Sequence, residues 1–145
     1  MNAANIPRAY TADRIFDGDR ILQDHAVLIR DDTVYDVLPM STCPNNLAVQ
    51  RHPGCTIVPG LVDAHMHFMR WQGPLFLAYG VTTVRDTGND LQWILQRRRE
   101  WPHQPWPRIL CLGPLLDGSP PGHPLVAQAI TSTDSAIAAV RQTAA

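Results

Sequence analysis

The chain has 145 residues, of which 45% are hydrophobic and 17% are charged, and this composition is typical of a folded globular protein. Its formal net charge of −1 offers no basic surface for nucleic acid, and no segment is apolar enough to predict a membrane span. We therefore expect a cytoplasmic protein that binds neither nucleic acid nor membranes. The three cysteines are widely spaced and predict neither a disulfide framework nor a cysteine-rich zinc site.

The first part of the chain is rich in β-branched residues and predicts β structure. A short strand is expected at Arg14–Phe16. It is followed by a hairpin whose strands cover His25–Arg30 and Thr33–Leu38, with two aspartates at the turn. A polar connection over residues 39–53 then leads to a brief strand at Cys55–Val58.

After Gly60 the pattern changes to alternating strands and helices. The expected strands cover residues 61–68, 81–86 and 108–112, and the expected helices cover 74–79, 89–101 and a segment that begins near Thr133. This succession is typical of a parallel sheet or of the opening of a (β/α) barrel. A complete barrel needs about 250 residues, so residues 59–145 can supply only its first three strands.

Helical spacing predicts which side chains of these helices are buried. In the helix over residues 89–101, a stripe of Leu91, Ile94, Leu95 and the stem of Arg98 is expected to face the sheet. The run of arginines at 97–99 is expected to be a solvated helix end, where cations complement the helix dipole. A long loop over residues 113–124 leads to the last helix. That helix is expected to be capped by Thr133 and to turn Ile137 and Val140 inward.

Two histidines share one face of the first strand after Gly60. Because side chains alternate along a strand, Asp63, His65 and His67 point to one side and the apolar Met66 and Phe68 point to the other. The histidines stand near the carboxyl end of the strand, where barrel enzymes place their chemistry. Two imidazoles about 6–7 Å apart at Cα can converge on one cation such as zinc.

The His-x-His pattern by itself leaves other interpretations open. Histidines at these positions are also compatible with ordinary surface or core residues, since a zinc site requires three or four ligands. A cupin-type β-barrel also holds metal through His-x-His. The helical patterns after Asn89 and Thr133 disfavour that all-β fold.

The flanking sequence resembles the amidohydrolase superfamily. The segment PGLVDAHMH at 59–67 is similar to that family's first-strand signature, and GVTTVRDTG at 80–88 resembles the second strand of its imidazolonepropionase- and prolidase-like branch. The segments at 14–18, 27–30, 107–109 and 113–118 are also similar to family elements. The resemblance implies an α/β fold. Residues 8–58 would form an incomplete β-sandwich, and residues 59–145 would form the first three βα units of an incomplete (β/α)8 TIM barrel.

The resemblance also implies site residues. His65 and His67 match two ligands of a Zn2+ site that holds one or two divalent ions. Asp63 is expected either to accept a hydrogen bond that orients an imidazole or to be satisfied by backbone donors. Asp86 could reach the mouth of the site, but a strand-ending cap is the favoured role. His123 lies in a loop that either contacts substrate or is simply exposed to solvent.

The activity that the resemblance implies is hydrolysis of carbon–nitrogen bonds in cyclic amides or peptide-like small molecules by metal-activated water. The family's further ligands and its catalytic aspartate lie on later strands, and the chain contains no lysine to match the one on strand four. No catalytic residue is therefore assigned within this chain. We expect an amino-terminal fragment that is inactive alone.

Two alternatives stay open. The first is a deaminase of the same superfamily with a single metal ion. The second is a non-catalytic module whose open sheet edge pairs with another chain, which includes a homo-oligomer.

Overall fold

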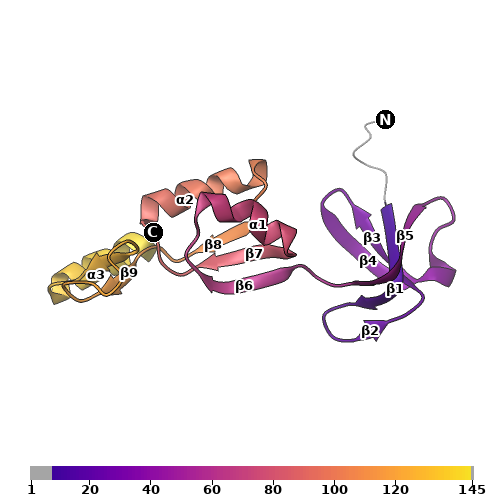
Figure 1. Cartoon of the computed structure of the whole chain (residues 1–145), viewed down its shortest axis with the longest axis horizontal. Helices are drawn as coiled ribbons and strands as arrows, with labels where there is room; N and C mark the ends of the chain where they lie inside the picture. The colour runs from indigo at the N-terminus through magenta and orange to yellow at the C-terminus, as the bar shows by residue number, and fades with distance from the viewer. Residues whose placement is uncertain (1–7, 145) are drawn as a thin grey trace. The chain divides into compact units, whose positions relative to one another are not determined.

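The computed structural model describes residues 8–144, which form a mixed α/β protein of two compact units (Figure 1). The units divide between Pro59 and Gly60, next to the boundary that the sequence predicts after residue 58. Within the described residues no helix is long and apolar enough to cross a membrane.

The first unit is a single five-stranded sheet around one long strand. Its strands are β1 (Arg8–Phe16), β2 (Ile21–Leu22), β3 (His25–Arg30), β4 (Thr33–Pro39) and β5 (Ala48–Ile57). β1 pairs antiparallel with β2 and β3 and parallel with β5, while β4 extends the sheet from β3. The predicted hairpin is confirmed, and its turn places Asp31 at φ 53°, a conformation that aspartate tolerates better than most residues.

Two predictions for this unit are wrong at the strand boundaries. β1 begins at Arg8 rather than Arg14, and β5 begins at Ala48, inside the expected polar connection. The reason is that the two strands pair over nearly their whole lengths, from Arg8 opposite Ala48 to Ile15 opposite Ile57. Such non-local pairing recruits polar residues that local β-propensity disfavours.

The core of the first unit is small. It contains Ala9, Ala26 and Leu28, with partly buried side chains packed against them at Leu38, Met40, Cys43, Leu47 and Val49. Met40 begins a short 3-10 helix, η2 (Met40–Thr42). The strands of residues 8–57 form one sheet, so the second layer of the expected sandwich is not found in the part of the chain that the structure describes.

The main sheet of the second unit has three parallel strands, joined by helices that lie on one side of the sheet (Figure 1). The elements in chain order are β6 (Leu61–Met66), η3 (Arg70–Gln72), α1 (Gly73–Ala78), β7 (Val81–Asp86), α2 (Leu91–Glu100), η4 (Trp101–His103) and β8 (Arg108–Cys111). The sheet order is β6-β7-β8, so each strand lies beside its predecessor. The predicted βαβαβ succession is confirmed.

The core of this unit lies between the sheet and the helices. Its buried members are Met66, Phe68, Val84, Ile94, Trp106 and Ile109. The rings of Phe68 and Trp106 meet edge to face, with their centroids 5.5 Å apart. Met66 and Phe68 pack on the side of the sheet that carries the helices. Because side chains alternate, His65 and His67 point to the opposite, helix-free face.

The predicted helix faces need correction in two places. In α2 the buried arginine is Arg97, whereas Arg98 is exposed, so the buried stripe follows Ile94 and Arg97. In the last helix, α3 (Thr133–Ala144), Ile137 and Val140 are 45% and 53% exposed, and Ala139 is the buried residue. The small residues on the inward face let α3 pack closely against the backbone at Gly113. A Cβ at Gly113 would lie 3.2 Å from Thr143 Cγ2.

The segment between β8 and α3 is more ordered than the expected loop. It contains a parallel pair of short strands, β9 (Leu115–Asp117) and β10 (Ala127–Ala129). The N-cap role falls to Ser132 rather than Thr133, because the Ser132 hydroxyl oxygen accepts the backbone N–H of Ser135 at 3.2 Å.

Candidate metal centre

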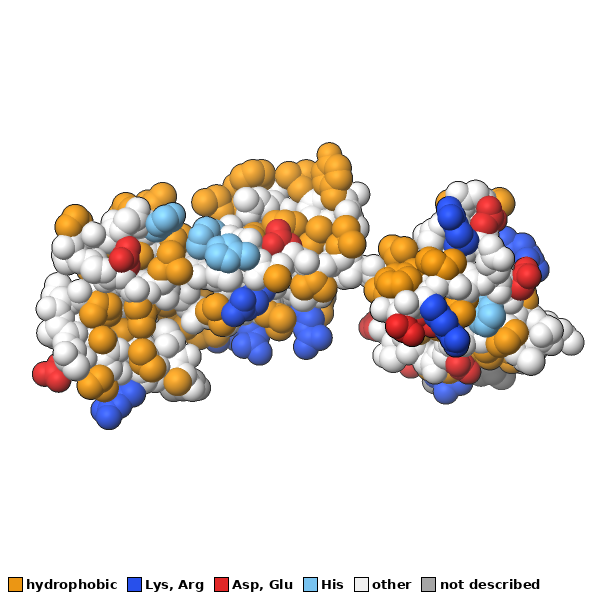
Figure 2. Space-filling model, turned by 90° about the horizontal axis from the view of Figure 1, so that it is seen from below, with side chains coloured by type: hydrophobic (Ala, Val, Ile, Leu, Met, Phe, Trp, Pro, Cys, Tyr) orange, Lys and Arg blue, Asp and Glu red, His pale blue; other side chains and the backbone are white. Residues whose placement is uncertain are grey.

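His65 and His67 lie side by side on the helix-free face of the sheet, at the carboxyl end of β6. Their ring centroids are 6.2 Å apart, and the two ring planes are inclined by 77°. His65 is exposed and His67 is half-buried. Figure 2 shows histidine side chains on the second unit, with an acidic side chain nearby and hydrophobic side chains around them. The structure therefore brings the two predicted ligands together.

The His67 ring is held by a backbone carbonyl. Its Nδ1 lies 2.8 Å from the carbonyl oxygen of Gly88, in the turn that follows β7. Since a carbonyl only accepts hydrogen bonds, Nδ1 is assigned the proton, and Nε2 keeps its lone pair. An imidazole that donates one N–H to a carbonyl and presents its other nitrogen is the usual arrangement of a metal-ligating histidine.

A glycine at position 88 permits this contact. A Cβ there would lie 3.0 Å from Cε1 of His67 and 2.9 Å from Cγ of Leu115. Those distances are shorter than ordinary carbon contacts, so any larger residue would push the carbonyl away from the ring. Sequence analysis missed this role of Gly88, although the glycine stands inside the second motif.

Asp63 is oriented toward the backbone. Its Oδ1 accepts the backbone N–H of His65 at 3.1 Å, and this is the hydrogen bond that the structure gives the carboxylate. Of the two roles that the sequence left open, satisfaction by a backbone donor is the one observed. The bond fixes the local backbone of β6 just before the first candidate ligand.

Asp86 has the predicted role of a strand-ending cap. The residue is fully buried at the end of β7. Its carboxylate accepts the backbone N–H groups of Phe68 at 2.7 Å and Gly88 at 3.1 Å, and the side-chain amide of Asn89 at 2.6 Å. Asn89 was not recognised from the sequence, where it was assigned only to the start of a helix.

His123 lies exposed in the loop between β9 and β10. Asp117 closes this loop, because its carboxylate accepts the backbone N–H groups of Gly118 and Gly122, each at 2.7 Å. The Gly122 and Gly118 donors lower the pKa of Asp117, with a smaller contribution from the charge of His123. The structure thus keeps His123 in an exposed loop and does not join it to the histidine pair.

The donors present fit zinc chemistry but are few. Neutral imidazole nitrogens are ordinary zinc ligands, and a protein zinc site uses three or four protein ligands. Residues 8–144 contain no group of three or more histidine, cysteine, aspartate or glutamate side chains placed to hold one ion. These residues can therefore contribute His65 and His67 as part of a site.

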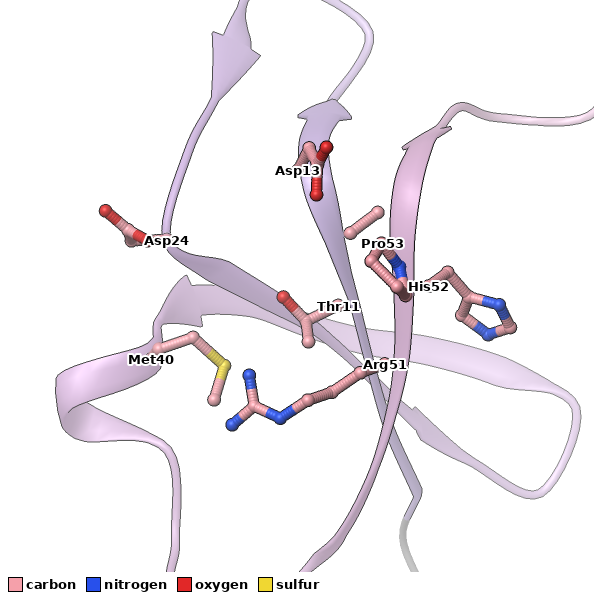
Figure 3. Close-up of a pocket in the computed structure, with 8 residues that line it drawn as sticks. Thr11, Asp13, Asp24, Met40, Arg51, His52 and Pro53 are labelled. Atoms are coloured by element: carbon pink, nitrogen blue, oxygen red, sulfur yellow. The ribbon is translucent and has the colours of Figure 1, made fainter.

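A separate cavity of about 280 Å³ lies in the first unit (Figure 3). Figure 3 shows the Arg51 side chain extending toward Met40 and Thr11, while the His52 ring points away. Asp13 lines the cavity but already accepts the backbone N–H of Gly54 at 3.0 Å. The lining carries charges of both signs and brings no histidine pair together.

Comparisons with known proteins point to one family. A family model described as the NagA composite domain matches residues 9–52. The fold is similar to that of a putative prolidase from Bifidobacterium longum, with a TM-score of 0.81 and 27% identity over 97% of this chain and 39% of that one.

Two further solved structures share the fold at lower identity. Ochratoxinase from A. niger has a TM-score of 0.71 and 17% identity over 97% of this chain and 44% of its own. N-acetyl-D-glucosamine-6-phosphate deacetylase from Mycobacterium smegmatis has a TM-score of 0.63 and 21% identity over 95% of this chain and 41% of its own. The chain thus spans less than half the length of these structures. Residues 9–52 match the NagA composite domain, and the fold of the chain is similar to that of prolidase-like amidohydrolases.

Proposed function

We propose that this chain is part of a metal-dependent hydrolase of carbon–nitrogen bonds in cyclic amides or peptide-like small molecules. The observation that supports the metal role most directly is the 2.8 Å contact between His67 Nδ1 and the Gly88 carbonyl, which leaves Nε2 free. A divalent ion such as Zn2+, when bound, would polarise the scissile carbonyl and supply a water nucleophile near neutral pH. His65 and His67 would hold that ion together with ligands from outside residues 8–144.

The surroundings of the histidine pair support a place inside a barrel. Leu61 on β6 and Leu110 on β8 are 56% and 42% exposed, and strand alternation puts them on the face opposite to the buried Met66 and Ile109. Such exposed leucines suit the inner surface of a closed (β/α) barrel, which is filled by bulky side chains. We therefore propose that β6, β7 and β8 are the first three strands of a TIM barrel.

We also propose that the 145-residue chain does not catalyse hydrolysis alone. Two imidazoles can bind zinc only weakly, and no general base is assigned among the described residues. The chain's own part is to bind and orient: Gly88 fixes the His67 ring, and Asp63 fixes the backbone at His65.

A zinc titration followed by NMR of the histidine rings tests this proposal. We expect the 15N signals of His65 and His67 to shift together, and either alanine substitution to remove both shifts. His103→Ala is the matched control, because His103 is exposed in η4 and should not affect binding. Zinc shifts confined to other histidines would contradict the metal site. Turnover of an Xaa-Pro dipeptide or an N-acyl amino acid by the zinc-loaded chain would contradict its inactivity.

A further inference from the structure

The backbone at Phe68, just after His67, lies beyond the end of β6. Side chains at the end of β7 and in the turn after it supply its hydrogen-bond partners. β6 ends at Met66, yet Phe68 is completely buried. A buried backbone N–H without an acceptor is strongly unfavourable. Oδ2 of Asp86 accepts the Phe68 N–H at 2.7 Å, and Nδ2 of Asn89 donates to the Phe68 carbonyl at 3.1 Å. Both backbone polar groups of Phe68, the residue after His67, are thus held by the last residue of β7 and by the turn that follows it.

The same carboxylate holds the residue that bonds the His67 ring. Oδ1 of Asp86 accepts the N–H of Gly88 at 3.1 Å, and Oδ2 accepts the Asn89 amide at 2.6 Å. Between them, the N–H of Thr87 donates to the carbonyl of Met66 at 2.9 Å. The turn over residues 86–89 is therefore fixed to the end of β6 on both sides of the ring.

We infer that Asp86 is a positioning residue for His67. Through Phe68 it fixes the backbone from which the imidazole extends. Through Gly88 it fixes the carbonyl that receives the Nδ1 proton, so it sets both the orientation and the tautomer of the ring. The expected effect of Asp86 on metal binding by His67 rests on the proposed function. The effect on the tautomer concerns the protein without metal.

Only a carboxylate suits this position. Asp86 receives hydrogen bonds from three N–H groups and donates none. An asparagine has nearly the same shape, but its NH2 group would stand in place of one carboxylate oxygen. It would then oppose either the Gly88 N–H, or both the Phe68 N–H and the Asn89 amide. Asp86→Asn therefore disrupts the network while it changes the volume of the buried side chain very little.

The test is 15N NMR of the imidazoles in the full chain at a pH where they are neutral, first without metal and then with Zn2+. In the unsubstituted chain we expect His67 to be in the Nδ1–H form. In Asp86→Asn we expect that form to lose its dominance, and zinc binding to His65 and His67 to weaken by about 10-fold, the low end for residues that support a metal ligand. Asp90→Asn is the matched control, because the Asp90 carboxylate caps α2 by accepting the Trp93 N–H at 2.8 Å and is not part of the hydrogen bonds around Asp86. It should leave the His67 tautomer unchanged.

A second variant covers the case in which Asp86→Asn does not fold. Gly88→Ala keeps the carboxylate but places a Cβ 3.0 Å from His67 Cε1, so it should displace the ring and lose the same tautomer preference. The inference is wrong if a folded Asp86→Asn, or Gly88→Ala in its place, keeps His67 in the Nδ1–H form. If zinc shifts no histidine of the unsubstituted chain, the proposed metal site fails, whereas the comparison of tautomers without metal still decides the role of Asp86.

Discussion

Arg97 and Glu100 form a partly buried ion pair in α2. The Arg97 Nη2 donates to Glu100 Oε1 at 2.9 Å, and the side chains are 6% and 30% exposed. The guanidinium also lies over the Trp93 ring, 5.2 Å from its centroid. Arg97 Nε and Glu100 Oε2 are buried without partners in the described part of the chain. The Arg97 charge therefore depends on Glu100 more than the Glu100 charge depends on Arg97, because Glu100 is the more exposed of the two.

This asymmetry predicts unequal costs of substitution. Glu100→Ala leaves a guanidinium that cannot reach water. Breaking a buried pair costs about 3–5 kcal/mol, and the 30% exposure of Glu100 reduces our expectation to about 2–3 kcal/mol. Arg97→Met leaves a carboxylate that can turn to solvent, so we expect a loss of about 1 kcal/mol. The double variant should be within about 1 kcal/mol of the unsubstituted chain, because an apolar side chain then replaces the pair.

Urea unfolding followed by tryptophan fluorescence measures these free energies. All four tryptophans, at 71, 93, 101 and 106, belong to the second unit, so the signal reports that unit alone. Arg99→Met is the control, since Arg99 is exposed on the same helix and should change the free energy of unfolding by no more than about 0.5 kcal/mol. The reasoning is refuted if Arg97→Met costs as much as Glu100→Ala, or if the losses in the double variant are additive.

Two other predictions concern the segment after β8. Because backbone donors lower the pKa of Asp117, the loop bonds that it accepts should persist above its ordinary value of 3.8 and be lost as pH falls through the lower folded value. Acid titration of the Gly118 and Gly122 amide shifts checks this, and a midpoint at or above 3.8 would contradict it. In α3, Ile137→Lys should change the free energy of unfolding by no more than about 0.5 kcal/mol, whereas Ala139→Leu should cost about 1–3 kcal/mol by overpacking. Urea unfolding separates the two, and a larger loss for Ile137→Lys would favour the helix face predicted from sequence.

The elements that could be predicted from sequence are those governed by local patterns. The bounds of β7 were predicted to the residue at Val81–Asp86, and α1 lies one residue earlier than expected. The full lengths of β1 and β5 could not be predicted, because their pairing joins residues 40 positions apart, such as Arg8 and Ala48. Side-chain burial in α2 and α3 was also missed. Helical spacing gives a set of faces, but the packing partner selects the one that is buried.

The candidate site shows the same division. Strand alternation is enough to put His65 and His67 on one face of the sheet. The motif at residues 80–88 is enough to predict that β7 ends at Asp86. The contacts of the Gly88 carbonyl with His67 and of Asp86 with Phe68 could not be assigned, because they join the end of β7 to the end of β6 and so depend on the sheet register. A buried carboxylate at a strand end predicts a cap, but it does not predict which backbone groups it accepts.

The order in which strands pair also bears on how the chain folds during synthesis. In the first unit, β5 must leave the ribosome before it can join β1, so that sheet cannot be completed until about residue 57 has been made. In the second unit, each strand joins the one made just before it, so this sheet can grow one strand at a time. Domains generally fold in the order of synthesis. On the ribosome, the first sheet should therefore form in one step when β5 pairs with β1. The second sheet should then grow strand by strand, from β6 to β8.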